Sequence, residues 1–304
     1  MVTNPVPQRM PPDQKWQYFE LWETINKLIR VLPNYFNSDI VIKGVDVTDL
    51  YSVGALFSTA IESNLVDGLN RTRNLWDADN KYLSLAFKRQ SQTFPDVLLV
   101  DSLENKIIFG IELKAWYALS KEGEPSFRFK IDPDACDKPD LLVVFPWLLS
   151  DVTAGKPVLL SPFVELAKYA AQMRNYNWQR YRTDKGEDPT IKRPNEQYRH
   201  PYPKAKQKSS DSSVNDQGNN FGRIARPGQG GLLDNYLAEI LNIYYLGIKL
   251  KHWSKIFKSI ADGSSDEQIN TALDRVLGKV QQELSAERSG DIQQNLLDDE
   301  QNEQ

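Results

Sequence analysis

Two short apolar runs joined by a polar turn are the feature that most constrains the fold of this chain. The runs span 97–100 and 107–113, the second interrupted by Glu112, and the residues at 102–106 read Ser-Leu-Glu-Asn-Lys. Runs of this kind are typical of β-strands, and so short a connection permits only antiparallel pairing. If the turn is centred on Glu104, the numbers of paired residues sum to 208, so Asp96 lies opposite Glu112.

This pairing brings three charged side chains to one face of the predicted hairpin. Directly opposed residues have Cβ atoms about 5 Å apart, and Lys114 shares the face of Glu112 because it lies two residues further along the strand. Two carboxylates this close repel each other unless a cation lies between them, and oxygen ligands suit Mg²⁺. A metal ion held there could polarise a phosphoryl oxygen and activate water. We therefore identify Asp96, Glu112 and Lys114 as candidate catalytic residues.

The composition excludes several other kinds of site. Cys136 is the only cysteine and His200 and His252 are the only histidines, which excludes an internal disulfide and a Cys/His zinc site. The chain also lacks GxSxG, GxxxxGKS/T and a strand-linked GxGxxG, the usual motifs of hydrolase, nucleoside triphosphate and dinucleotide sites. No apolar run reaches the roughly 18 residues of a membrane span, and the first residues do not resemble a signal peptide. We expect a cytoplasmic protein without membrane contact.

Helices are predicted on both sides of the strand region. Apolar residues recur at helical spacing over 13–32, and again from Thr48 to a stop at Gly68. Strands are predicted within 82–114 and at 140–149, where short apolar runs alternate with turn residues. The order of helix, strands and helix predicts an α/β or α+β fold.

The second half of the chain divides by charge and periodicity. A helix is predicted to open at Ser161-Pro162, and three more between 232 and 288, the last with a capping box of Ser264 and Glu267. Between Arg174 and Arg226 there are twelve Lys and Arg against six Asp and Glu, although the whole chain has a net charge of -4. The predicted regions are an N-terminal helical extension (1–47), a core (48–182), a polar basic loop that contacts DNA or is mobile (183–231), a C-terminal helical region (232–288) and a disordered acidic tail (289–304).

Pro95-Asp96 and Glu112-Leu113-Lys114 resemble the two halves of the motif of the PD-(D/E)xK nuclease superfamily, over roughly 50–180. An ExK triplet alone is expected by chance about once in a chain of this length. Three other Pro-Asp pairs occur, at 12–13, 133–134 and 139–140, and none is followed by an ExK within the length of a hairpin. What distinguishes the pair at 95–114 is the combination of two strands, a short turn and a matching register. The alternatives are an inactive relic of that fold and a coincidence.

The resemblance implies a fold and a fuller set of site residues. It implies a mixed central sheet flanked by helices, a restriction-endonuclease-like core to which the N- and C-terminal helices are additions. It implies Mg²⁺, for which Mn²⁺ substitutes, bound by Asp96, Glu112 and the main-chain carbonyl of Leu113. An acid on the helix before the sheet often supports this site, and Glu62 is the candidate. The QxxxY motif of some branches is matched by Gln172 and Tyr176.

The closest resemblance is to type II restriction endonucleases, which cut double-stranded DNA, usually as homodimers, and whose host needs a partner DNA methyltransferase. A repair, recombination or mobile-element nuclease of the same fold is the alternative, and a catalytically inactive DNA-binding protein is an alternative of a different class. The candidate DNA contacts are the basic residues of the middle region: Arg174, Arg180, Arg182, Lys192, Arg193, Lys204, Lys206, Lys208, Arg223 and Arg226.

Overall fold

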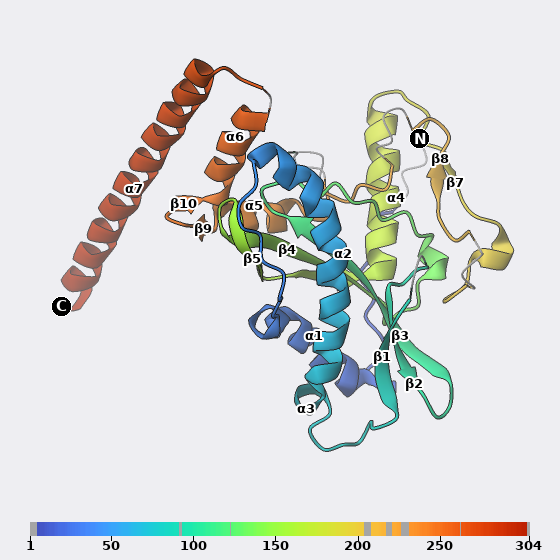
Figure 1. Ribbon diagram of the computed structural model, residues 1–304. Coiled ribbons are helices and arrows are strands. Elements are labelled where there is room, and N and C mark those ends of the chain that lie inside the picture. The colour runs from blue at the N-terminus through green and yellow to red at the C-terminus, as the bar shows by residue number, and fades with distance from the viewer. Residues whose placement is uncertain are drawn as a thin grey trace.

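The computed structural model describes residues 5–90, 93–121, 123–203, 208–216, 221–225, 231–261 and 263–302. They form a mixed α+β structure around a central sheet, as the order of elements predicts (Figure 1). The helices are α1 (Phe19–Val31), α2 (Val47–Arg71), α3 (Arg73–Trp76), α4 (Ala167–Asp184), α5 (Asp234–Asn242), α6 (Leu250–Ala261) and α7 (Asp266–Asn302). Short 3-10 helices are η1 (Leu32–Tyr35), η2 (Pro133–Ala135) and η3 (Glu196–Tyr198).

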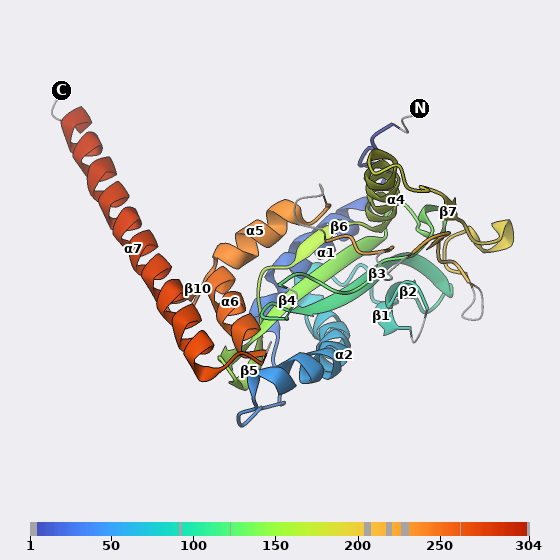
Figure 2. The same cartoon turned by 90° about the horizontal axis from the view of Figure 1, so that it is seen from above.

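The central sheet has the strand order β1-β2-β3-β4-β5, and β6 also pairs with β4. Its strands are β1 (Leu85–Arg89), β2 (Val97–Asp101), β3 (Lys106–Tyr117), β4 (Leu141–Asp151), β5 (Ala154–Leu159) and β6 (Phe163–Leu166). Only the β3–β4 pair is parallel, so the sheet is mixed. Seen from above, α2 lies on one side of the sheet, and α1 and α4 lie on the other (Figure 2).

The hairpin of β2 and β3 has the predicted register at the end that carries the candidate residues. Val97 pairs with Ile111 and Leu99 with Phe109, so these numbers sum to 208. Between Leu99 and Val100 the register shifts, because Ile108 has no partner on β2, and beyond the shift the sum is 207. The turn that follows includes Asn105 at a φ of 51°. Asn tolerates this left-handed conformation better than most residues do.

Several predicted helix boundaries differ from those of the structure. The helix predicted from Ser161 begins only at Ala167, because residues 163–166 form β6 against β4. Gly68 does not end α2, which runs to Arg71. The capping box of α7 lies one residue later than predicted, with Ser265 and Gln268 bonding each other's backbone N–H groups.

Outside the central sheet, the region predicted as a polar loop contains two short strands, β7 (Ile191–Lys192) and β8 (Ser212–Ser213), which pair with each other. The tail predicted as disordered is helical as far as Asn302, as the end of α7. A second short hairpin, β9 (Tyr244–Tyr245) and β10 (Ile248–Lys249), precedes α6. Among the described residues, no helix has both the length and the apolar character of a membrane span.

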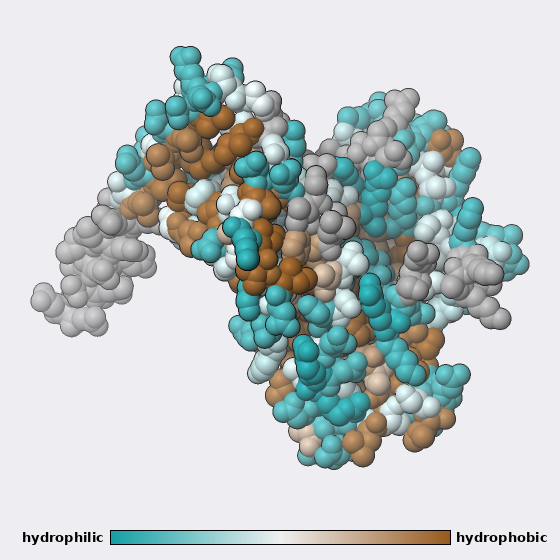
Figure 3. Space-filling model, in the orientation of Figure 1, coloured by the Kyte–Doolittle hydropathy of each residue, from teal (hydrophilic) through white to brown (hydrophobic). Residues whose placement is uncertain are grey.

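The core is continuous between the sheet and the helices that cover it. Trp147, Phe109 and Phe145 are among its largest fully buried side chains, and Trp116 and Tyr117 are also buried. Apolar surface also gathers over α6 and the described part of α7, where Leu277 and Leu284 are exposed (Figure 3). The three candidate catalytic residues lie on β3, the middle strand of the sheet order, and immediately before β2.

Candidate active site

The candidate active site lies where β3 continues beyond the end of β2. Val97, the first residue of β2, pairs with Ile111, so the backbone N–H groups further along β3 on that side have no partner among the strands that the structure describes. Two carboxylates accept hydrogen bonds from these N–H groups instead. Asp96 Oδ2 lies 3.0 Å from Leu113 N, and Glu62 Oε1 lies 3.2 Å from Ala115 N. The end of β2 thus leaves room beside β3 for Asp96, which immediately precedes β2, and for Glu62, which comes from α2.

The ammonium group of Lys114 lies at the centre of this arrangement. Its Nζ is 2.7 Å from Glu112 Oε1, 3.0 Å from Asp96 Oδ2 and 2.9 Å from the carbonyl oxygen of Leu113. These are the three oxygens that the family resemblance implies as metal ligands. The structure therefore brings Asp96, Glu112, Leu113 and Lys114 together, and a cationic group lies among all three oxygens.

Burial and charge act against each other at these groups. Burial raises the pKa of Glu112 to about 7, with Lys114 opposing the shift and the carboxylate of Asp96 adding to it. Burial also raises the pKa of Glu62, again opposed by Lys114. For Lys114, burial lowers the pKa, but the carboxylates of Glu112 and Asp96 outweigh burial and raise it. At neutral pH the lysine is therefore charged.

The donor set fits a hard divalent cation such as Mg²⁺. Asp96 and Glu112 supply carboxylate oxygens and Leu113 a carbonyl oxygen, the ligand types that Mg²⁺ prefers. Among the residues that the structure describes, no three His, Cys, Asp or Glu side chains are grouped so as to hold a metal ion. A cation here would thus be held by two carboxylates and a carbonyl, and Glu62 would act through the backbone of β3.

A hollow of about 690 Å³ opens beside Glu112. Its lining comes from the segment before β2, from the connection between β3 and β4, and from residues 208–212. The basic residues of the lining are Arg128, Lys130 and Lys208. Of the three candidate catalytic residues only Glu112 contributes to this lining, so the hollow is an approach to one side of the site.

Gly110 lies on β3, two residues before Glu112, and packs closely against Pro95, the residue before Asp96. A Cβ atom at position 110 would lie 2.2 Å from Pro95 Cγ and 3.1 Å from Asp140 Oδ1. Asp140 accepts hydrogen bonds from the Gly110 N–H at 2.6 Å and from the Tyr202 hydroxyl at 2.6 Å. Because Asp140 is fully buried, its pKa is raised to about 7, although these hydrogen bonds oppose the shift. The sequence did not reveal this support.

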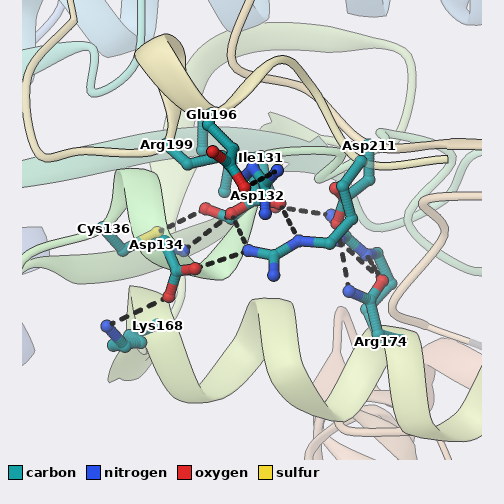
Figure 4. Close-up of polar contacts among 11 residues, drawn as sticks. Ile131, Asp132, Asp134, Cys136, Lys168, Arg174, Glu196, Arg199 and Asp211 are labelled. Carbon is teal, nitrogen blue, oxygen red and sulfur yellow. Dashed lines mark hydrogen bonds and ion pairs between the residues drawn. The ribbon is translucent and has the colours of Figure 1, made fainter. Parts of the chain in front are cut away.

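A second cluster of charged residues joins α4 to the lining of the hollow. Arg174 donates hydrogen bonds to Asp211 Oδ2 at 2.5 Å and to the carbonyl oxygen of Ile131 (Figure 4). It also donates a hydrogen bond to the carbonyl oxygen of Phe129. Asp211 lies beside Asp132, and burial raises the pKa of Asp211 to about 7, with Arg174 opposing the shift. The cluster was missed in the sequence because its residues come from separate segments. Its geometry indicates that it holds the connecting segments together.

The structure corrects the prediction that Arg174 contacts DNA, because its side chain is 1% exposed and bound to Asp211. Other predicted contacts also form ion pairs within the chain. Arg193 binds Asp132 and Asp134. Arg182 binds Glu187, and Arg223 binds Glu124. The guanidinium of Arg180 lies over the ring of Tyr176. Lys192 is exposed on β7, whereas Lys204, Lys206 and Arg226 lie outside the described residues.

Gln172 and Tyr176, predicted as site support, line a different hollow. It has a volume of about 440 Å³ and is formed between α4 and the N-terminal segment around Pro7 and Met10. None of Asp96, Glu112 and Lys114 contributes to its lining. The QxxxY match therefore lies on a surface of α4 that the N-terminal segment covers in part.

No family model matches the chain, and no match to it was found among curated proteins or solved structures. The functional argument therefore depends on the residues of the site and on their geometry.

Proposed function

We propose that this protein is a Mg²⁺-dependent endonuclease that hydrolyses phosphodiester bonds of double-stranded DNA. The observation that carries the proposal is the Lys114 ammonium, which lies within 3.0 Å of oxygens of Asp96, Glu112 and Leu113. A position that binds one positive charge through three oxygens is suited to a divalent cation, because the two carboxylates then have a stronger counter-charge.

Each residue has a distinct task in this proposal. Asp96, Glu112 and the Leu113 carbonyl would bind Mg²⁺ or Mn²⁺, and the bound metal would polarise the phosphoryl oxygen and lower the pKa of a water molecule. Lys114 keeps its charge at neutral pH, so it can hold the phosphate or orient the water next to the two carboxylates. Glu62 holds the backbone of β3 at Ala115, and its carboxyl group lies close enough to favour the charged form of Lys114.

Among nucleases, the proposal favours a sequence-specific restriction enzyme of type II that acts as a homodimer and is paired with a DNA methyltransferase. The support is the resemblance in Pro95-Asp96 and Glu112-Leu113-Lys114, together with helices added on both sides of the core. A nuclease of repair, recombination or mobile elements would use the same chemistry. It would prefer a DNA structure over a base sequence.

The second candidate is a non-catalytic DNA-binding protein of the same fold. The observation that favours it is again Lys114, because its ammonium already neutralises part of the negative charge of Asp96 and Glu112. In that case the lysine would be a permanent substitute for the metal. The two candidates differ in whether a divalent cation can displace the lysine from these oxygens.

Digestion of a plasmid with the purified protein tests the proposal. We expect cleavage with Mg²⁺ or Mn²⁺ and none with Ca²⁺ or EDTA, because Ca²⁺ binds oxygen ligands loosely and activates water poorly. Discrete fragments would indicate a sequence-specific enzyme, and a smear would indicate a structure-guided or nonspecific one. Full activity in EDTA would contradict the metal site, and an intact plasmid under all conditions would favour the binding protein.

A further inference from the structure

The hollow beside Glu112 combines a carboxylate of the candidate active site with three basic residues. Arg128 and Lys130 belong to the connection between β3 and β4, and Lys208 comes from the segment before β8. Arg128 and Lys208 are exposed and Lys130 is half-buried. Within the part of the chain that the structure describes, no ion pair joins any of the three to an acidic residue, so their charges are available to a ligand.

The acidic residues of the lining do not cancel this positive charge. Glu112 is bound to Lys114 at 2.7 Å, and Asp211 is buried and bound to Arg174. The open part of the hollow is therefore basic. Ser210 and Ser212, which are exposed in the same lining, add hydroxyl groups that can donate hydrogen bonds.

The backbone around the basic residues is held on two sides. On one side the Asp211 N–H donates to the carbonyl of Lys130 at 2.8 Å. On the other side the Phe129 N–H donates to the carbonyl of Gly222, also at 2.8 Å. Gly222 packs against Lys130 so closely that a Cβ atom at position 222 would be 2.6 Å from Lys130 Cγ. Arg174 also donates a hydrogen bond to the carbonyl oxygen of Phe129. Arg128 and Lys130 are thus presented by a fixed backbone, which reduces the entropy lost on binding.

We propose that this hollow holds the sugar-phosphate backbone of the DNA strand next to the bond that is cut, with Arg128, Lys130 and Lys208 contacting its phosphates. This inference rests on the proposed function, because Glu112 gives the hollow its relation to the reaction. Exposed Lys, Arg and Ser side chains are the usual phosphate contacts in protein–DNA complexes. The contacts position the strand and read no base sequence.

Binding of a short labelled DNA duplex in Ca²⁺, which prevents cleavage, tests the inference through its dependence on salt. Each phosphate contact adds about 0.9 to the slope of the logarithm of the binding constant against the logarithm of salt concentration. The variant Arg128→Gln/Lys130→Gln should lower this slope by about 2 and weaken binding on the order of tenfold. Lys27→Gln/Arg30→Gln, which removes the same charges from the exposed side of α1, is the matched control and should leave the slope unchanged.

A second variant, on another segment, distinguishes the loss of a phosphate contact from local misfolding around Phe129. Lys208→Gln should lower the slope by about 1 without affecting the segment around Phe129. If both variants keep the parent slope, the hollow does not hold the backbone, even where the parent protein cuts DNA. If the parent protein binds the duplex with a slope that depends on these residues but never cuts, the hollow is supported and the nuclease activity is contradicted.

Discussion

The ammonium of Lys114 and the carboxylate of Glu112 form the shortest ion pair of the candidate site, with 2.7 Å between Nζ and Oε1. Glu112 is 12% exposed in its side chain, so the pair lies largely out of water. Removing one partner of a buried pair leaves the other charge uncompensated. Asp96 and Lys114 carry opposite charges towards the same phosphate, so their variants should differ in DNA binding as well as in cleavage.

Without metal, Asp96→Ala should bind DNA as tightly as the parent protein or more tightly, because a carboxylate that repels phosphate has been removed. Lys114→Ala should bind more weakly, on the order of tenfold, because two carboxylates remain without their cation. Anisotropy titrations of a labelled duplex in EDTA measure both. Adding Ca²⁺ should reduce the difference, and equal affinities of the two variants in EDTA would contradict this electrostatic account.

Glu62 should affect the site in two ways. Its carboxylate contributes negative charge, and its Oε1 holds the backbone of β3 by accepting a hydrogen bond from Ala115 N–H. Glu62→Gln keeps an acceptor for the Ala115 N–H and removes the charge, whereas Glu62→Ala removes both. We expect both variants to cut more slowly at limiting Mg²⁺, and only Glu62→Ala to lose stability, by about 1 kcal/mol. Denaturant unfolding and cleavage rates over a range of Mg²⁺ concentrations separate the two effects. Unchanged cleavage by both variants would remove Glu62 from the site.

Gly110→Ala should damage both stability and the site. The added Cβ would lie 2.2 Å from Pro95 Cγ, so the backbone next to Asp96 must shift. We expect a loss of about 1–3 kcal/mol in the free energy of unfolding and weaker metal binding, measured by calorimetry. Gly278→Ala on α7 is the control, because nothing lies within 4 Å of its Cβ and alanine favours a helix. The prediction fails if the two variants are equally stable.

The free energy of unfolding should fall between about pH 4 and pH 7, partly because of Asp140. Its pKa is raised to about 7 in the folded state by burial, against about 3.9 in an unfolded chain. In this window the folded protein holds a proton that the unfolded chain releases, so rising pH favours unfolding, by up to about 4 kcal/mol. Asp211 has the same sign. Denaturant unfolding at pH 5 and pH 8 should show a smaller decrease for Asp140→Asn than for the parent, and an equal decrease would contradict the assignment.

The part of the site that depends on local pattern could be predicted from the sequence. The short turn centred on Glu104 placed Val97 opposite Ile111, and the structure confirms that register. Extending it by one residue leads to Asp96 and Glu112. What the pattern could not show is that β2 ends there, which leaves Leu113 N–H free for Asp96. The residue at which a strand ends depends on the contacts of the neighbouring segment, which the local sequence pattern does not show.

The residues that depend on distant contacts could not be predicted. An arginine at position 174 is expected on the surface of the helix. It can be buried because Asp211, 37 residues later, lies against it. Arg128 and Lys130 alternate with Phe127, Phe129 and Ile131, a pattern that predicts an extended segment with one buried face. It does not show that this segment lies beside Glu112. Their position depends on backbone contacts to residues that follow α4.

Cleavage of supercoiled plasmid in Mg²⁺ by the parent protein and by Asp96→Asn tests the central claim most directly. Asp96→Asn keeps the size of the side chain and an oxygen acceptor for the Leu113 N–H, but it removes the negative charge that would bind the cation. Asp13→Asn, a change of the same type before α1, is the control. We expect the parent and Asp13→Asn to nick or linearise the plasmid at the same rate, and Asp96→Asn to lose cleavage by at least about a hundredfold. Cleavage by Asp96→Asn at the parent rate would contradict the assignment of Asp96 as a metal ligand and with it the proposed active site.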